Sequence, residues 1–101
     1  MALLINEHTL SAGEMVAAFI AENHLATLVG TRTGGQVLGG GNFTVGQGLV
    51  LRLPAAAWYT WRGVVVEGVG VAPDVEVPLS LADLRRGRDT QLEAATTRVR
   101  G

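Results

Sequence analysis

Two short apolar runs on either side of a helical pattern constrain the fold of this chain more than any other feature. The runs "ALLIN" at residues 2–6 and "ATLVGT" at residues 26–31 have the length and composition of buried strands. Between them, residues 11–24 have the periodicity of a helix. The apolar face of that helix consists of Met15, Val16, Phe19 and Ile20. The order strand, helix, strand predicts a parallel βαβ crossover and places the chain in the α/β class.

The middle of the chain predicts a β-hairpin after a glycine-rich stretch. Residues 33–42, "TGGQVLGGGN", contain five glycines, so a strand formed there would be weak and flexible. Residues 43–60 alternate in polarity and turn at residues 46–48, as a hairpin does. A second turn, at residues 62–63, precedes a short predicted strand at residues 64–66, and a loop rich in Gly and Pro follows.

Two helices are predicted near the C-terminus. Ser80 precedes a short helix that ends at Gly87, and Asp83 stands at the third position of a capping box. Residues 88–100 form a further predicted helix with a thin apolar stripe of Leu92, Ala95 and Val99. The sequence has neither internal repeats nor an interdomain linker, so residues 1–101 are expected to form a single domain.

The composition excludes several classes of function. Of the 101 residues, 48% are hydrophobic and 17% are charged, which is typical of a folded domain. A net charge of −1 leaves no basic stripe, so no nucleic-acid partner is expected. With no cysteine and two histidines, the chain offers no thiolate nucleophile and no Cys- or His-rich metal site, and no cofactor is indicated. The sequence has no signal-peptide pattern and no apolar run of about 18 residues, and both the cell envelope and the cytoplasm stay open as compartments.

The N-terminus leads directly into a predicted buried strand, because Met1 and Ala2 are followed by "LLIN". Natural domains seldom begin within a sheet, so we expect the chain to be the C-terminal piece of a longer one. A short N-terminal arm is the alternative. A piece of this kind leaves open sheet edges and apolar surface, which favour a homodimer or higher oligomer, with strand exchange as one route.

The stretch "HTLSAGEMVAAF" permits two roles for Ser11. Ser11 directly precedes the helical segment and Glu14 follows three residues later, which is the pattern of a capping box. Capping serines are common and nucleophilic serines are rare, so a cap is the default interpretation. The two roles are compatible, because free N–H groups at a helix N-terminus can also stabilise an oxyanion.

The sequence alone leaves the roles of several further residues open. Glu14 is expected to accept a hydrogen bond from the N–H of Ser11, and His8 is expected to be an ordinary loop residue. Glu67, which ends the predicted strand before "GVGVAPD", is either solvated or orients a histidine or a substrate amine. Gln36 is either a polar loop residue or part of a site. Core or interface packing is the favoured role of the clustered aromatic residues Trp58, Tyr59 and Trp61.

Several motifs follow one another at nearly ungapped spacing. They are "N-x-x-T-x-S-A-x-E" at residues 6–14, "V-G-x-x-T-x-G" at 29–35, "Y-T-x-x-G" at 59–63 and "G-x-G-V-x-P-D" at 68–74. In this order they resemble the C-terminal half of the protease domain of tail-specific, or C-terminal processing, peptidases of the S41 type. The resemblance extends to about residue 95. It implies a fragment of the crotonase/ClpP-like spiral fold, with a βαβ unit followed by a β-hairpin and C-terminal helices, and a serine-type endopeptidase activity.

The resemblance also implies roles for individual residues. Ser11 corresponds to the serine that attacks the peptide carbonyl, and the N–H of Ala12 to a donor of the oxyanion hole. The processing branch places its base, a lysine, at the position of Gln36, but this chain has no lysine and arginine is a poor base. The tricorn-like branch uses a histidine from earlier in the chain with a glutamate, and "VEGVGVAPD" matches that motif at Glu67. Glu14 and Gln36 are candidate accessory residues.

These parallels imply peptide or unfolded-protein substrates for the parent protein. The chain alone is expected to be inactive, because its base histidine would lie before Met1 in the remainder of the parent chain. One alternative is a non-catalytic apolar-ligand or peptide binding module on the same fold, with the glycine-rich stretch, Trp58 and Trp61 lining a pocket. Another is an interaction domain that uses the aromatic segment. The presence of both Ser11 and Glu67 favours the peptidase.

Overall fold

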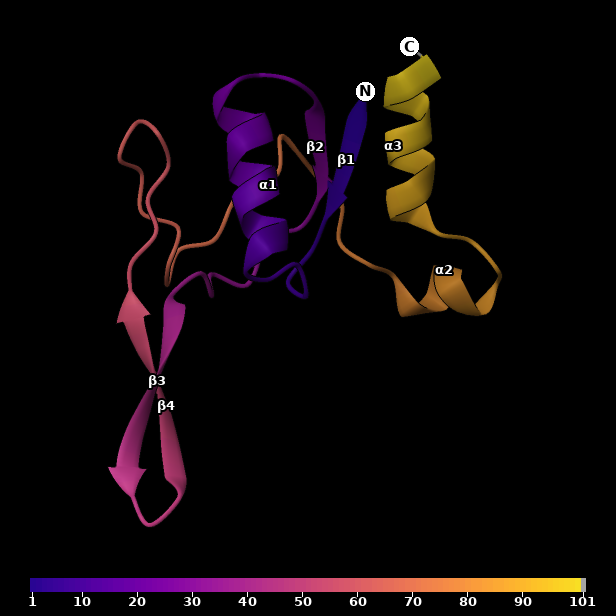
Figure 1. Cartoon of the computed structure of the whole chain (residues 1–101). Helices are drawn as coiled ribbons and strands as arrows, with labels where there is room; N and C mark the ends of the chain where they lie inside the picture. The colour runs from indigo at the N-terminus through magenta and orange to yellow at the C-terminus, as the bar shows by residue number, and fades with distance from the viewer. Residues whose placement is uncertain (101) are drawn as a thin grey trace.

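The structure, a computed structural model, describes residues 1–100 and contains three parallel strands, a β-hairpin and three helices. The elements, in chain order, are β1 (Ala2–Ile5), α1 (Ala12–Glu22), β2 (Thr27–Gly30), β3 (Gly39–Gly46), β4 (Leu49–Ala56), β5 (Val75–Glu76), α2 (Leu81–Arg85) and α3 (Thr90–Arg100). Figure 1 shows a body of sheet and helices from which the hairpin β3–β4 projects. The molecule therefore extends over 57 × 35 × 17 Å.

The predicted βαβ crossover is confirmed. The sheet has the strand order β1-β2-β5 with parallel pairing, and Leu3 lies opposite Leu28 while Leu4 lies opposite Val29. Alternation along the strands turns Leu3 and Leu28 toward α1, and Leu4 lines a hollow against α3 on the opposite face. The two helices thus lie on either side of the strands (Figure 1).

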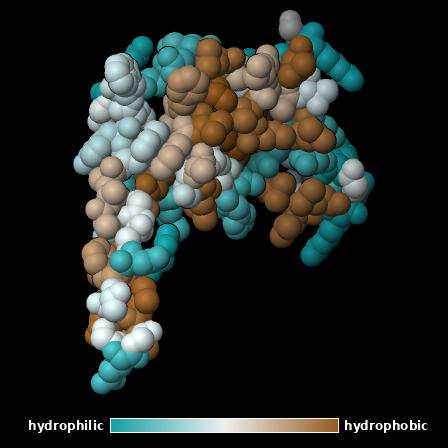
Figure 2. All heavy atoms as spheres, viewed as in Figure 1, coloured by the Kyte–Doolittle hydropathy of each residue, from teal (hydrophilic) through white to brown (hydrophobic). Residues whose placement is uncertain are grey.

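The core lies between α1 and the sheet. Its buried members are Ile5, Ala17, Ala18, Leu28, Val37, Val66 and Val71. The small side chains of Ala17 and Ala18 let α1 approach the strands closely. The outer face of α1 is uncovered, because 53% of Val16 and 59% of Phe19 are exposed. Figure 2 shows apolar residues gathered on the surface between α1 and α3.

The hairpin is confirmed, but it spans residues 39–56 and so begins and ends four residues earlier than the sequence indicated. The last glycines of the glycine-rich run belong to the hairpin itself, because Gly40 and Gly41 pair with Pro54 and Leu53 at its base. Its turn consists of Gln47 at φ 53° and Gly48 at φ 75°, and positive φ at both central residues matches the twist of a two-residue turn. Every strand residue of the hairpin beyond Gly41 is exposed, and an isolated two-stranded hairpin is marginally stable.

The predicted strand at residues 64–66 is wrong, because the segment contributes only an isolated bridge between Tyr59 and Val65. The Thr60 hydroxyl accepts the N–H of Val64 at 3.0 Å, and the carbonyl of Val66 accepts turn hydrogen bonds from residues 69 and 70. These local bonds bend the chain where a strand would have to run straight.

The last part of the chain holds one element that the sequence did not indicate. The strand β5 lies in the segment assigned to a loop, and it pairs with β2. The two predicted helices are confirmed as α2 and α3, and the Ser80 hydroxyl accepts the N–H of Asp83 at 3.2 Å as expected of a cap. No helix within residues 1–100 combines the length and hydropathy that crossing a lipid bilayer demands.

Candidate active site

Ser11 occupies the turn between β1 and α1, directly before the first helical residue. Its backbone has φ 53° and ψ −118°, a conformation that costs a non-glycine residue roughly 1–3 kcal/mol. The N–H of Ser11 donates to the carbonyl oxygen of Gln36 at 2.9 Å and to Oε2 of Glu14 at 3.2 Å. These two bonds hold the strained residue in place, and its side chain lies exposed to solvent.

The capping box expected at Ser11 and Glu14 is present, and its Glu14 contact is the hydrogen bond from the N–H of Ser11 to the carboxylate. The Ser11 hydroxyl approaches the N–H of Glu14 as in a capping box, but it makes no hydrogen bond to it. Ser80 provides the contrast, because it has the extended backbone of an ordinary cap, φ −101° and ψ 114°, and its hydroxyl accepts a hydrogen bond. Ser11 therefore has a hydroxyl that its own helix does not use.

The backbone N–H of Ala12 is the neighbouring donor. Among residues 1–100 it has no hydrogen-bond acceptor, as the first N–H of a helix has no intrahelical partner. It lies at the positive end of the α1 dipole and next to the exposed hydroxyl. A free N–H in this place can stabilise an oxyanion that forms when the hydroxyl attacks a carbonyl.

Glu14 does more than complete a capping box. Its side chain is fully buried and its carboxylate accepts four hydrogen bonds. The donors besides Ser11 are the Thr33 hydroxyl at 2.6 Å, the N–H of Gly35 at 2.6 Å and the N–H of Gln36 at 2.8 Å. Burial raises the pKa of Glu14, but these donors outweigh burial and hold its pKa below the ordinary value. The carboxylate thus fastens the start of α1 to the loop after β2.

Gln36 lies beside Ser11 through its backbone, because its carbonyl oxygen accepts the N–H of Ser11 and its own N–H donates to Glu14. The Gln36 side chain is exposed. An amide cannot take up a proton near neutral pH, so Gln36 offers a hydrogen-bonding group beside the serine but no base.

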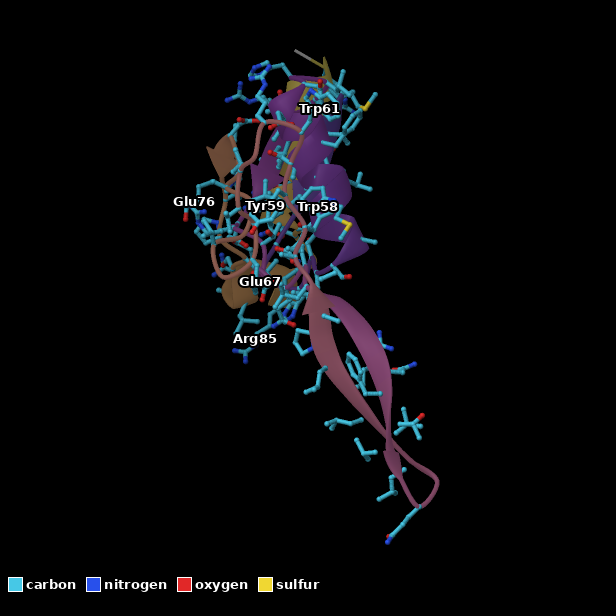
Figure 3. The ribbon with its side chains drawn as sticks, turned by 60° about the vertical axis from the view of Figure 1, so that its left-hand side comes forward. Trp58, Tyr59, Trp61, Glu67, Glu76 and Arg85 are labelled. Carbon is cyan, nitrogen blue, oxygen red and sulfur yellow. The ribbon has the colours of Figure 1, made fainter. Side chains whose placement is uncertain are left out.

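Glu67 lies in a turn and does not end a strand, contrary to the sequence interpretation. It is half-buried, and its Oε2 accepts the N–H of Val37 at 2.5 Å and that of Leu38 at 3.2 Å. Its Oε1 accepts no hydrogen bond from residues 1–100. Ser11 and Glu67 therefore bind adjacent residues of one segment, 36–38. Figure 3 shows Glu67 at the end of the body from which the hairpin projects.

Several candidate residues lie outside this cluster. The His8 side chain is 85% exposed, with Nε2 at 3.7 Å from Oε1 of Glu7, so His8 is a loop residue as expected. Trp58 packs against the core, while Trp61 is 98% exposed at the opposite end of the body from Glu67 (Figure 3). The alternative of a pocket lined by Trp58 and Trp61 stays a prediction, and the hollows described in this structure are lined by other residues. Within residues 1–100, no three His, Cys, Asp or Glu side chains gather closely enough to hold a metal ion.

Thr33 is the site residue to which sequence reasoning gave no role. Its hydroxyl donates to Glu14 and accepts the N–H of Val71 at 2.7 Å, and its own N–H donates to the carbonyl of Val71 at 3.1 Å. Its place in the "V-G-x-x-T-x-G" motif was the available signal, but the partners lie far away in sequence.

Comparisons with known proteins identify the family to which the chain belongs. The model of Peptidase family S41 matches residues 1–77. The chain is 33% identical over 90 residues to the carboxy-terminal-processing protease of Bartonella bacilliformis, covering 89% of this chain and 21% of that protein. It is 39% identical over 92 residues to tricorn protease homolog 1 of Streptomyces coelicolor, covering 89% of this chain and 9% of that protein.

Solved structures of proteases have the same fold. The crystal structure of the tricorn protease superposes with a TM-score of 0.83 at 32% identity, over 93% of this chain and 9% of that one. The photosystem II D1 C-terminal processing protease superposes with a TM-score of 0.71 at 28% identity, over 76% of this chain and 20% of that one. The chain thus spans about a fifth or less of the length of these relatives. The chain belongs to peptidase family S41, and its α/β fold is the one found in the proteases of that family.

Proposed function

We propose that this chain is the C-terminal part of a serine peptidase catalytic domain and that Ser11 is its nucleophile. The observation that carries the proposal is the combination of a strained backbone and an uncommitted, exposed hydroxyl at Ser11, on a sharp strand-to-helix turn. Strained turns of this kind present nucleophilic serines in other α/β hydrolases. Membership of a peptidase family makes the peptide bond the expected target.

The chemistry follows the acyl-enzyme route. Oγ of Ser11 attacks the carbonyl carbon of a peptide bond while its proton passes to a base, and the carbonyl oxygen becomes an oxyanion. The N–H of Ala12 donates to that oxyanion. The tetrahedral intermediate collapses, the amine leaves with the proton, and water then hydrolyses the ester at Ser11.

The base comes from outside these residues. The chain has no lysine, the amide of Gln36 is no base, and His8 pairs with Glu7 in solvent. A histidine from the remainder of a longer parent chain fills this role, and Glu67 orients it through Oε1 while Val37 and Leu38 hold Oε2. The chain alone is therefore inactive, because a serine hydroxyl without a base is a weak nucleophile.

The substrates of the parent protein are peptides or unfolded proteins. One relative is named a carboxy-terminal-processing protease. A nucleophile in an exposed turn can reach the peptide bonds of an extended polypeptide. This substrate class is part of the proposal.

Exposed apolar surface supports a partner for this chain. A hollow of about 520 Å³ beside the start of β1 is lined by Met1, Met15, Val16, Phe19, Ile20 and Leu25. In the parent protein the remainder of the domain covers this surface. In the isolated chain a second copy does so, giving a homodimer or higher oligomer.

The same hollow supports a second candidate function, a non-catalytic module that binds an apolar ligand. Hydrolysis of a casein-type unfolded substrate by the longer protein separates the two. The peptidase predicts activity that Ser11→Ala abolishes and that the 101-residue chain lacks. The binding module predicts instead that the longer protein cleaves no substrate and that Ser11→Ala leaves its binding of apolar ligands unchanged.

A further inference from the structure

Thr33 lies between the two parts of the proposed active site, the start of α1 with Ser11 and the loop that carries Glu67. It is 5% exposed and belongs to the extended segment between β2 and β3. On one side its hydroxyl contacts the carboxylate that holds Ser11, and on the other it contacts the loop that carries Glu67. The residue is therefore placed to fix the distance between the start of α1 and residues 67–71.

The direction of each hydrogen bond follows from the chemistry of the groups. An ionised Glu14 can only accept, and a backbone N–H can only donate, so the single hydroxyl proton of Thr33 must point to Glu14. The oxygen of Thr33 is then free to accept from Val71 N–H. A directed chain results, from Val71 N–H through the Thr33 hydroxyl to Glu14, which also accepts the N–H of Ser11.

Backbone contacts also hold the loop of residues 67–71 against the segment 33–35. The N–H of Gly68, next to Glu67, donates to the carbonyl of Gly35 at 2.8 Å. Gly70 allows the approach because a Cβ on it would lie 2.3 Å from the carbonyl oxygen of Thr33. A side chain at residue 70 would push the loop away, so the contact between Thr33 and Val71 is a close fit.

From this geometry we infer that Thr33 is a positioning residue, whose hydroxyl sets the placement of Ser11 relative to Glu67 through Glu14 and Val71. The inference rests on the proposed function for the meaning of that placement, but the coupling itself is a property of this chain. Thr33 touches neither the substrate nor the reacting atoms in this role.

The test replaces Thr33 with valine, which keeps the shape and removes the hydroxyl, and with serine, which restores it. Thr60→Val is the matched control. Thr60 is buried as well, and its hydroxyl accepts the N–H of Val64 at 3.0 Å while its N–H donates to the Val64 carbonyl. It makes the same pair of backbone contacts without a carboxylate that leads to Ser11.

The readout in the isolated chain is nuclear magnetic resonance of ¹⁵N-labelled protein. Thr33→Val is expected to speed hydrogen exchange at Val71 N–H by about tenfold or more, since a buried bond is lost. It is also expected to shift the amide signals of Ser11, Val37 and Leu38 together and to raise the Glu14 pKa. Thr33→Ser reverses these changes, and Thr60→Val causes none of them. Changes confined to Val71 and its neighbours would overturn the inference.

A titration of the unmodified chain provides the same test if Thr33→Val does not fold. Protonation of Glu14 removes its negative charge and turns one acceptor oxygen into a donor, which weakens the hydrogen bonds at the centre of the chain of bonds. The amide signals of Ser11 and Val71 should then move with one shared midpoint, and separate midpoints contradict the coupling.

Activity of the longer protein gives a second, separable readout. Misplacement of a catalytic group by about 1 Å can cost about 100-fold in rate, so Thr33→Val is expected to lower kcat by about 10- to 100-fold with little change in KM. Thr33→Ser should recover most of this loss. A failure of the proposed function is recognised differently, because the longer protein with Thr33 intact then shows no Ser11-dependent cleavage while the resonance result stands.

Discussion

The N–H of Ser11 and the carbonyl oxygen of Gln36 are joined by a hydrogen bond of 2.9 Å, which fixes residue 36 directly beside the proposed nucleophile. The exposed side chain at this position is an amide, and the resemblance of the sequence to processing peptidases implies a lysine base at this position in that branch. The consequence is that a single substitution can test whether the missing group is the base.

Gln36→Lys is expected to raise the reactivity of Ser11 in the isolated chain toward a fluorophosphonate. A positioned general base contributes about 10²–10⁴-fold, and a lysine that is not optimally desolvated supplies the lower part of this range. The measurement is the rate of labelling followed by intact mass. Gln36→Arg is the matched control, because it adds a similar length and charge but cannot accept a proton at neutral pH. Equal rates for the two variants would mean that residue 36 does not reach Ser11.

The two serines that precede helices are expected to respond differently to substitution. Ser80→Ala should destabilise the chain by about 1 kcal/mol, because a cap hydrogen bond is lost. Ser11→Ala should cost less, since its hydroxyl makes no such bond, and Ser11→Gly should be about 1 kcal/mol more stable than Ser11→Ala because glycine tolerates a positive φ. Urea unfolding followed by circular dichroism measures all three. A loss at Ser11→Ala as large as that at Ser80→Ala would identify Ser11 as a plain cap.

Glu14→Gln is expected to destabilise the chain by about 2–4 kcal/mol. The amide group of glutamine has one acceptor oxygen where the carboxylate has two, and its NH₂ would face the donors of Ser11 and Gln36. Glu76→Gln, at the exposed residue of strand β5, is the control, with an expected change within about 0.5 kcal/mol. Comparable losses for the two variants, measured by urea unfolding, contradict a structural role for the Glu14 carboxylate.

The stability of the chain should fall in acid because of Glu14. Its pKa is lower in the folded chain than the ordinary value of 4.5, so its contribution is fully present above that value. The contribution is lost as the pH falls through the lower, folded pKa. Unfolding free energies measured from about pH 7 down to about pH 3 should therefore decline more steeply for the native chain than for Glu14→Gln. Parallel curves would show that Glu14 does not carry this dependence.

Some parts of the fold could be predicted because their signals are local. The βαβ unit follows from apolar runs and helical periodicity, and the cap at Ser80 follows from a motif that spans four residues. The strand β5 could not be predicted, since only two residues pair with β2 and their neighbours include Pro73. The false strand at 64–66 arose because the hydroxyl of Thr60 takes the N–H of Val64, a competition that residue patterns do not show.

The candidate site also has parts that could be predicted from the sequence and parts that could not. Ser11, Ala12, Glu14, Gln36 and Glu67 could be named from motifs. The hydrogen bonds that join Ser11, Glu14 and Gln36, and those from residues 37 and 38 to Glu67, are the finding of the structure. The positive φ of Ser11 could not be predicted, because a serine that caps a helix and a serine with a strained backbone can occur in the same sequence pattern. The role of Thr33 depends on Val71, which lies 38 residues away along the chain.

The most direct test of the central claim is to locate the adduct of a fluorophosphonate on the longer protein and on the 101-residue chain by peptide mass spectrometry. Ser11 as nucleophile with its base outside this chain predicts an adduct on Ser11 of the longer protein, no adduct on the isolated chain, and none in either after Ser11→Ala. An adduct on another residue, or a longer protein that hydrolyses peptides with Ser11 unlabelled, would contradict the account.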